Sequence, residues 1–298
     1  MQEIAPGVAM IDTLLGGGAE ITAVYLVRGG DGAAIVDTGA RTSAPALRTA
    51  LAEAGIRADD LRWIVLTHVH LDHCGATGIL AHAFPRAQVV VHRRGARHLI
   101  DPARLLAGSA AVYGERWSLY GGLDRTAAER VEAVEDGHAV DLGGGRRLRM
   151  LETPGHARHH MSVLDEATGT VFAGDALGVR FPRTGLYPAL PPPDIDPAAG
   201  DRSLGRLAEL APALLCLPHF GPVDDAAGAI AEARRQLALC AESAAGAPDR
   251  EEVARALEQR LPFAATVGDE AAVARWRRLG WAEDTIDGLL AWGRAAAA

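Results

Sequence analysis

The segment THVHLDH (67–73) holds three imidazoles and one carboxylate within six positions, which is ligand chemistry typical of a metal site. In an extended chain, residues i and i+2 point to the same side, so His68 and His70 can reach one metal ion. If the chain then turns into a helix, Asp72 and His73 swing toward a second ion. So dense a motif is rarely accidental, and it predicts metal binding rather than a solvated histidine cluster.

Three later segments each place one more ionisable residue directly after a predicted strand. TPGH contains His156, FAGDA contains Asp175 and LPHFGP contains His219. Each signal is weak alone, because a histidine after Pro-Gly is commonly a turn residue. Four strand ends that deliver such groups to one edge describe a single site built across a sheet sandwich.

The chain around these motifs alternates between strands and helices. Strands are predicted at 21–29, 32–40, 61–67, 87–93 and 213–218, and helices at 43–55 and 76–84. Further strands are predicted in the segments ERVEAV, HAVDL, RRLRMLETPG, HMSVLD and GTVFAGD. An alternating β/α core in two halves, followed by helices, predicts an α/β sandwich with a helical C-terminal extension.

Three segments outside the motifs complete the chain. The stretch 94–130 contains short helical pieces broken by Pro102 and by a Gly-Gly pair. The loop 178–200 is rich in Pro and Gly, and a long loop beside candidate ligands is more often functional than accidental. Four C-terminal helices are predicted at 224–245, 249–261, 270–279 and 282–296.

The motif THVHLDH, with TPGH, AGD and LPHFG in that order, resembles the metallo-β-lactamase superfamily. The strand pair ending in VDTG (36–39) also fits that family, and the resemblance covers about residues 4–223. It implies a four-layer αβ/βα metallo-β-lactamase sandwich with its metals at one edge. The expected catalytic domain spans 1–223, with 94–130 as a helical insertion over the site, and 224–298 forms the helical C-terminal extension. This layout is similar to the branch that includes glyoxalase II, acyl-CoA thioesterase-like proteins and lactonases.

The resemblance also implies seven metal ligands, of which three hold one ion, three hold a second and one bridges them. The first set is His68, His70 and His156, the second is Asp72, His73 and His219, and the bridge is Asp175. Asp37 of VDTG is then a carboxylate behind the ligands that steadies one of them or its loop. The expected cofactors are two divalent metal ions, zinc before iron or manganese, although the ligand types are compatible with each.

Such a pair of ions would act on a shared water. Two divalent cations lower the pKa of that water to near neutrality, and the resulting hydroxide attacks a carbonyl or phosphoryl centre. Asp72 is the expected catalytic residue, because it can orient the hydroxide as well as bind metal. The chain contains no GxSxG motif and no P-loop, and no Ser or Cys nucleophile is needed. The leading hypothesis is a metallohydrolase of acyl esters, thioesters or lactones.

Two other functions stay open. A mononuclear-iron enzyme similar to persulfide dioxygenases would have an incomplete second site, which Asp72, His73 and His219 argue against. A non-catalytic binding or regulatory protein could keep a metal site as a scaffold, and the complete ligand set disfavours this hypothesis without settling it. β-Lactam hydrolysis is disfavoured because no signal peptide is recognised, and RNA or DNA cleavage is disfavoured by the acidic balance of the chain.

The amino-acid composition limits the class of protein and the cellular compartment in which this chemistry would occur. The 298-residue chain is 49% hydrophobic with a formal net charge of −8, which predicts a globular protein with a small-molecule substrate and no nucleic-acid partner. Three cysteines in no disulfide pattern, no signal peptide and no long apolar stretch predict a cytoplasmic protein without a membrane span. The C-terminal helices could form either a homodimer surface or a lid.

Some histidines and one cysteine near the motifs have competing interpretations. Cys74 is predicted to be a packing residue rather than a nucleophile. His160 is equally compatible with a contact behind the ligands and with strand packing. The other histidines are expected at the surface or in structural positions, and they are His82, His92, His98, His138 and His159.

Tyrosines and arginines outside the motifs are candidates for substrate contacts. A tyrosine of the insertion or the loop could donate to a developing oxyanion, but lid packing is favoured. The three tyrosines concerned are Tyr113, Tyr120 and Tyr187. Arg277 and Arg278 of WRRLGW could meet an acidic substrate group, although surface placement is favoured.

Removing one ligand should remove function and metal together. We expect Asp175→Ala and His70→Ala each to abolish hydrolysis and to lower the bound metal, because both residues are predicted ligands. Elemental analysis and activity of the purified variants check this expectation. A wild-type protein that carries no transition metal after aerobic and anaerobic purification would contradict the predicted site.

Overall fold

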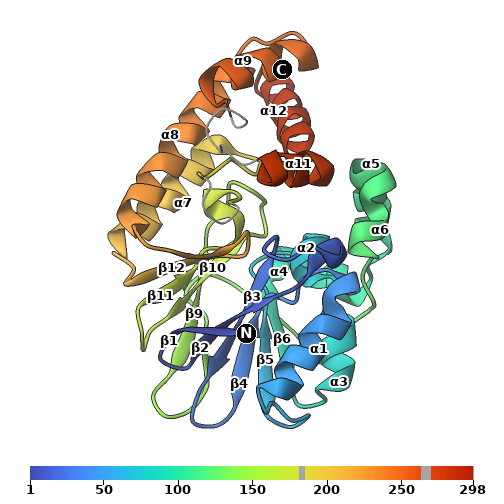
Figure 1. The fold of residues 1–298 in the computed structure, drawn as a ribbon, viewed down its shortest axis with the longest axis vertical. Helices are drawn as coiled ribbons and strands as arrows, with labels where there is room; N and C mark the ends of the chain where they lie inside the picture. Colours follow the sequence, from blue (N-terminus) through green and yellow to red (C-terminus); the bar gives the residue numbers. More distant parts are fainter. Residues whose placement is uncertain (181–184, 263–269, 298) are drawn as a thin grey trace.

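The computed structural model describes residues 1–180, 185–262 and 270–297, and two β-sheets packed face to face form its centre (Figure 1). In this described part, seven strands form the first sheet, and they are β1 Gln2–Ala5, β2 Val8–Asp12, β3 Ala23–Arg28, β4 Ala33–Val36, β5 Leu61–Val65, β6 Gln88–His92 and β7 Val131–Val134. Six described strands form the second sheet, and they are β8 Ala139–Asp141, β9 Arg147–Glu152, β10 Met161–Asp165, β11 Thr170–Phe172, β12 Leu214–Leu217 and β13 Gly221–Val223. Spatial order follows chain order in both sheets.

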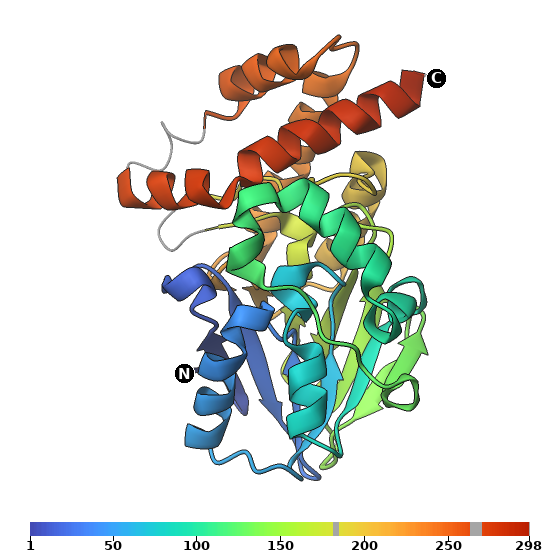
Figure 2. The ribbon, with the colours of Figure 1, turned by 90° about the vertical axis from the view of Figure 1, so that its right-hand side faces the viewer.

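Helices cover the outer faces of the sheets and one end of the sandwich (Figures 1 and 2). On the first-sheet side and above it lie α1 Ala44–Glu53, α2 Leu71–Cys74, α3 Thr77–Ala83, α4 Arg93–Ile100, α5 Ala103–Tyr113 and α6 Trp117–Tyr120. On the second-sheet side and in the C-terminal part lie α7 Pro197–Glu209, α8 Ala226–Ala244, α9 Arg250–Arg260, α11 Glu270–Leu279 and α12 Trp281–Ala297. The predicted four-layer αβ/βα sandwich with C-terminal helices is confirmed. None of the described helices has the length and apolarity needed to cross a bilayer.

Alternating side chains along the strands separate two apolar cores. Val8 and Met10 of β2 belong to the core between the sheets, together with Phe172 of β11. Their neighbours Ala9 and Ile11 point to the opposite face and belong to the core beneath the helices. Because successive side chains of a strand point to opposite faces, a sheet covered on both sides needs apolar residues at successive positions.

Strand directions bring the predicted motifs to one edge of the sandwich. β4 and β5 are parallel, so Asp37 and His68 follow them at the same edge of the first sheet. In the second sheet β9, β11 and β12 share one direction, because β10 is antiparallel to both β9 and β11 while β12 is parallel to β11. Their carboxyl ends lead to the other ligand candidates, which are His156, Asp175 and His219.

The stretch 94–130 contains short helices, as predicted, and lies beside the C-terminal helices (Figure 2). Its segment α5–α6 ends at Gly121, whose φ of 74° is a left-handed conformation that glycine adopts without strain. Arg116 in this segment donates hydrogen bonds to the Leu279 carbonyl and to the Asp284 carboxylate. Segments far apart in the sequence therefore meet at the edge that carries the motifs.

One predicted loop ends earlier than expected. The prediction of a loop over 178–200 is wrong at its C-terminal end, because α7 already begins at Pro197. The Asp196 side chain caps this helix by accepting a hydrogen bond from the Ala199 backbone N–H. Aspartate before a first-turn proline is a helix-start signal that the Pro- and Gly-rich composition concealed. Residues 181–184 of this loop lie outside the described residues. Strands β1, β2 and β13 were not predicted, and β1 and β13 are edge strands.

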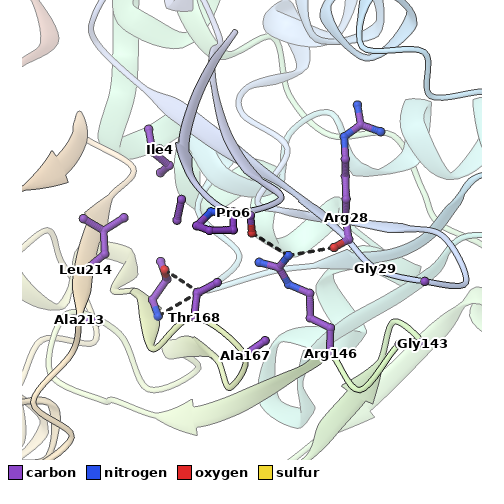
Figure 3. Close-up of a pocket in the computed structure, with 14 residues that line it drawn as sticks. Ile4, Pro6, Arg28, Gly29, Gly143, Arg146, Ala167, Thr168, Ala213 and Leu214 are labelled. Atoms are coloured by element: carbon purple, nitrogen blue, oxygen red, sulfur yellow. Dashed lines mark hydrogen bonds between the residues drawn. The ribbon is translucent and has the colours of Figure 1, made fainter.

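At the opposite end of the sandwich, an open cleft lies between turns of both sheets (Figure 3). Arg146 in this cleft donates from Nη1 to the carbonyl oxygens of Pro6 and Arg28, each 3.0 Å away. Its Nη2 pairs with the Asp165 carboxylate, whose side chain has no solvent exposure. Arg146 therefore offsets a buried negative charge while it joins the two sheets.

Removing Arg146 should destabilise the fold strongly. We expect Arg146→Met to lower the free energy of unfolding by about 3–5 kcal/mol, because the Asp165 carboxylate would stay buried without its cationic partner. Urea unfolding followed by circular dichroism measures the change. The matched control is Arg234→Met, which breaks the exposed ion pair with Asp201 and should change stability little. Equal stability of the two variants would contradict a structural role of Arg146.

Candidate metal centre

The THVHLDH segment changes conformation where its spacing predicts. His68 follows β5, His70 is still extended with φ −75° and ψ 150°, and α2 begins at Leu71. The extended part directs the first two histidines to one side, and the following helical turn carries Asp72 and His73. All these side chains are buried except that of His70, which is partly exposed.

Three histidine side chains converge to form the first group. His70 Nδ1 lies 3.1 Å from His68 Nε2 and 2.8 Å from His156 Nε2. One ligand atom from each of the three lies within 4.8 Å of the others, as the atoms around a single ion would. Three imidazole nitrogens at such distances need a proton or a cation between them, and neutral imidazole is a good metal ligand.

The second group consists of two histidines and one aspartate. His219 Nε2 lies 3.3 Å from His73 Nε2. Asp72 Oδ2 lies 3.7 Å from His73 Nε2 and 3.6 Å from His219 Nε2. These three ligand atoms also lie within 4.8 Å of one another. The group combines two nitrogen donors with one oxygen donor, which suits zinc, iron or manganese.

Asp175 lies between the two groups. Its Oδ2 is 3.6 Å from His156 Nε2 in the first group. Its Oδ1 is 3.5 Å from His73 Nε2 and 3.6 Å from His219 Nε2 in the second group. Oδ1 is buried and has no hydrogen-bond partner among the described residues. A buried carboxylate oxygen without a donor fits a metal ion, because an unpaired buried charge is otherwise very costly.

The pKa values of His68 and His70 shift in the opposite direction to that of His73. Burial, with the charges of neighbouring imidazoles, holds the pKa of His68 and of His70 well below the usual range. Burial also opposes protonation of His73, but the Asp175 and Asp72 carboxylates outweigh it and raise the His73 pKa well above its usual value. The first group is therefore neutral and free to ligate, and carboxylate charge in the second group attracts a cation.

Contacts behind the ligands hold their rings. Asp37 Oδ2 lies 3.1 Å from His73 Nδ1, and Asp37 Oδ1 accepts a hydrogen bond from the Thr67 backbone N–H at 2.8 Å. The predicted position of Asp37 behind a ligand is confirmed. Thr67 Oγ1 also lies 3.0 Å from His68 Nδ1, a contact that the sequence analysis missed. Asp37 has a φ of 61°, a left-handed conformation in which aspartate is enriched.

The side chain of His160 supports Asp175 through the backbone. His160 Nε2 accepts a hydrogen bond from the Asp175 backbone N–H at 2.9 Å, and His160 Nδ1 lies 2.9 Å from the Thr153 carbonyl oxygen. The ring is therefore neutral with its proton on Nδ1, and burial lowers its pKa to about 3. Of its two interpretations, the contact behind a ligand is confirmed. His156 is held similarly, because its Nδ1 lies 2.7 Å from the Ala189 carbonyl oxygen.

Other candidates from the sequence lie near the ligands or at the surface. His159, expected at the surface or in a structural position, is partly buried beside the cluster, where its ring lies 5.8 Å from that of His70 and burial lowers its pKa to about 3. Cys74 has no solvent exposure, as predicted for a packing residue. Arg277 and Arg278 are exposed, in accordance with the favoured interpretation.

The tyrosines of the insertion pack against each other within range of the Asp72 charge, which agrees with the favoured packing role. The rings of Tyr113 and Tyr120 stack with centroids 4.2 Å apart. Burial raises the pKa of both phenols well above the usual value, and the Asp72 carboxylate adds to the shift. Tyr187 lies in a separate place, bridged to Val179 by backbone pairing.

The sandwich and its histidine–aspartate cluster define a metal-binding αβ/βα protein. A family model described as the metallo-beta-lactamase superfamily matches residues 17–219. The chain therefore belongs to the metallo-beta-lactamase superfamily.

Relatives with known sequences or structures agree with this assignment. The metallo-beta-lactamase fold-containing protein ST1585 of Sulfurisphaera tokodaii is 36% identical over 208 residues, which is 68% of this chain and 74% of that protein. The crystal structure of ST1585 from Sulfolobus tokodaii superimposes with a TM-score of 0.73 at 28% identity, covering 95% of this chain and 98% of that one. The hydroxyacylglutathione hydrolase of Stenotrophomonas maltophilia is 32% identical over 155 residues, which is 52% of this chain and 45% of that enzyme.

The buried neutral His160 should make the metal-free protein sensitive to acid. Its folded pKa of about 3 lies below the ordinary value of 6.5, so the unfolded chain binds a proton that the folded chain refuses between these pH values. Stability is therefore lost as the pH falls from about 6.5 toward 3, by up to about 1.4 kcal/mol per pH unit from this residue.

The variant His160→Gln removes this titration but keeps an acceptor for the Asp175 backbone N–H. We expect its free energy of unfolding, measured in chelator, to fall less steeply with acidification than that of the wild type. Above pH 7 the two proteins should share the same pH dependence, which serves as the internal control. Parallel curves between pH 6.5 and 4 would contradict the prediction.

Proposed function

We propose that this chain is a hydrolase that binds two divalent metal ions and cleaves acyl esters, thioesters or lactones. The observation that carries the proposal is the placement of Asp175, whose two carboxylate oxygens face different ligand groups. A single metal ion would need only one of these two ligand groups. A carboxylate directed at both is the arrangement expected of a bridging ligand.

The residues present fit two ions. His68, His70 and His156 would hold the first, while Asp72, His73 and His219 would hold the second. When bound, such ions lower the pKa of a coordinated water and polarise a substrate carbonyl. Five imidazoles and two carboxylates favour zinc, and they are compatible with iron or manganese.

Asp72 is the candidate catalytic residue of the chain. Its carboxylate directs Oδ2 toward His73 and His219, and its side chain is 9% exposed. A carboxylate in this position can orient an attacking water and accept its proton. The neighbouring thiol of Cys74 is no substitute nucleophile, because burial raises its pKa well above the ordinary value and the side chain has no solvent exposure.

The proposed substrate class rests on several supports. Relatives named hydroxyacylglutathione hydrolases match part of the chain, which supports an acyl substrate. The net charge of −8 suits a small organic substrate better than a polyanion. A single-iron enzyme similar to persulfide dioxygenases is disfavoured, because its second ligand group would be incomplete, whereas here three ligand atoms converge there.

Metal analysis combined with a substrate panel tests the proposal. We expect about two equivalents of metal per chain and turnover of at least one thioester, ester or lactone in a panel that also contains phosphodiesters. Asp72→Asn should lower kcat by about 100-fold or more, because it removes the base that orients water. Asp201→Asn, at an exposed ion pair, is the matched control and should keep full activity.

The outcomes separate the competing functions. One equivalent of iron with oxidative turnover would replace the proposal with the mononuclear hypothesis. Two equivalents of metal without turnover of any substrate would favour a non-catalytic binding protein. Cleavage of phosphodiesters alone would keep the metal centre and overturn the acyl substrate class.

A further inference from the structure

His219 differs from the other buried ligand candidates in how its ring is held. His68, His73 and His156 each place their second ring nitrogen near an oxygen of Thr67, Asp37 or Ala189. The Nδ1 atom of His219 is buried and has no hydrogen-bond partner among the described residues. Since hydrogen bonds normally fix the orientation of a ligating imidazole, some other contact must restrain this ring.

Trp281 provides such a contact. Its ring meets that of His219 edge to face, with centroids 4.7 Å apart and planes inclined at 73°. Trp281 is the first residue of α12 and is 8% exposed. The superfamily match ends at residue 219, so this contact comes from a part of the chain that the family model does not cover.

One contact holds the Trp281 indole, and an ion pair holds the first turn of α12. The indole hydrogen-bonds the phenol of Tyr120, which stacks on Tyr113 in the insertion. Three residues further along α12, Asp284 forms a two-point ion pair with Arg116, with N–O distances of 2.6 and 2.8 Å. The side chains of Arg116 and Asp284 are 21% and 9% exposed, so water screens this pair weakly.

We propose that Trp281 is a positioning residue for the second metal ion, because it restrains the His219 ring by packing, whereas hydrogen bonds restrain the rings of His68, His73 and His156. The C-terminal helix α12 thereby supports one ligand candidate from outside the sandwich. The Arg116–Asp284 pair and Tyr120 hold Trp281 against His219. This inference rests on the two-metal function proposed above.

Zinc titration of the metal-free full chain, in competition with a chromophoric chelator, tests the proposed role of Trp281. Trp281→Ala should weaken binding of the second zinc equivalent by about 10- to 100-fold, the usual cost of losing support behind a ligand, and should leave the first equivalent within about twofold. Trp281→Phe keeps a ring against His219 and should restore the second equivalent to within about threefold. Trp281→Leu keeps apolar volume without a ring and should resemble Trp281→Ala.

The matched control is Trp292→Ala, which removes a partly buried indole from the same helix. It should bind both equivalents as the wild type does. Circular dichroism of each metal-free variant reports whether the fold is kept, and if Trp281→Ala does not fold, the Leu and Phe variants decide. Wild-type affinity for the second equivalent in the Leu variant would overturn the positioning role while leaving the two-metal proposal intact. A wild-type chain that binds one equivalent would overturn both.

Discussion

Burial of the Asp175 carboxylate between two groups of imidazoles is the constraint on which the rest of the structure depends. A charged group in this position, 5% exposed, would be strongly destabilising unless positive charge offsets it. Neighbouring imidazoles, led by His73, outweigh the effect of burial and hold the Asp175 pKa well below its usual range. The protein part of the centre is thus arranged for cations before any is bound, and it brings ligands from both sheets to one point.

Side chains from both sheets hold the ligand candidates in place around Asp175. Strand ends supply the ligands, and side chains one layer further out orient them, as Asp37 does for His73 and Thr67 does for His68. His160 holds the Asp175 backbone and remains neutral, because burial lowers its pKa and its Nε2 is occupied as an acceptor. A site supported in this way loses little conformational entropy when it binds metal, since its rings are already ordered.

Local sequence patterns predicted the strands, the helices and the convergence of the ligand candidates, because each depends on residues close together in the chain. Alternation of side chains in the extended segment places His68 and His70, and the helical turn that begins at Leu71 places Asp72 and His73. Both conformations depend on residues that are close together in the chain. The same is true of the C-terminal helices. The Asp196 cap was available in the sequence but was outweighed by Pro-rich composition. Contacts between distant segments, such as Trp281 on His219, have no local pattern and required the folded chain.

Because of these contacts between distant segments, the two ligand groups differ in how closely other side chains cover them. On the second-group side, Trp281 lies on the His219 ring, and the stacked tyrosines of the insertion lie beyond it. On the first-group side, His70 is more exposed than the other six ligand candidates, all of which are buried. The first group is therefore the less covered of the two at His70, whereas His219 in the second group is covered by the Trp281 ring. The sheet edge thus brings the ligand candidates together, whereas residues of the insertion and of α12 determine how His219 in the second group is covered.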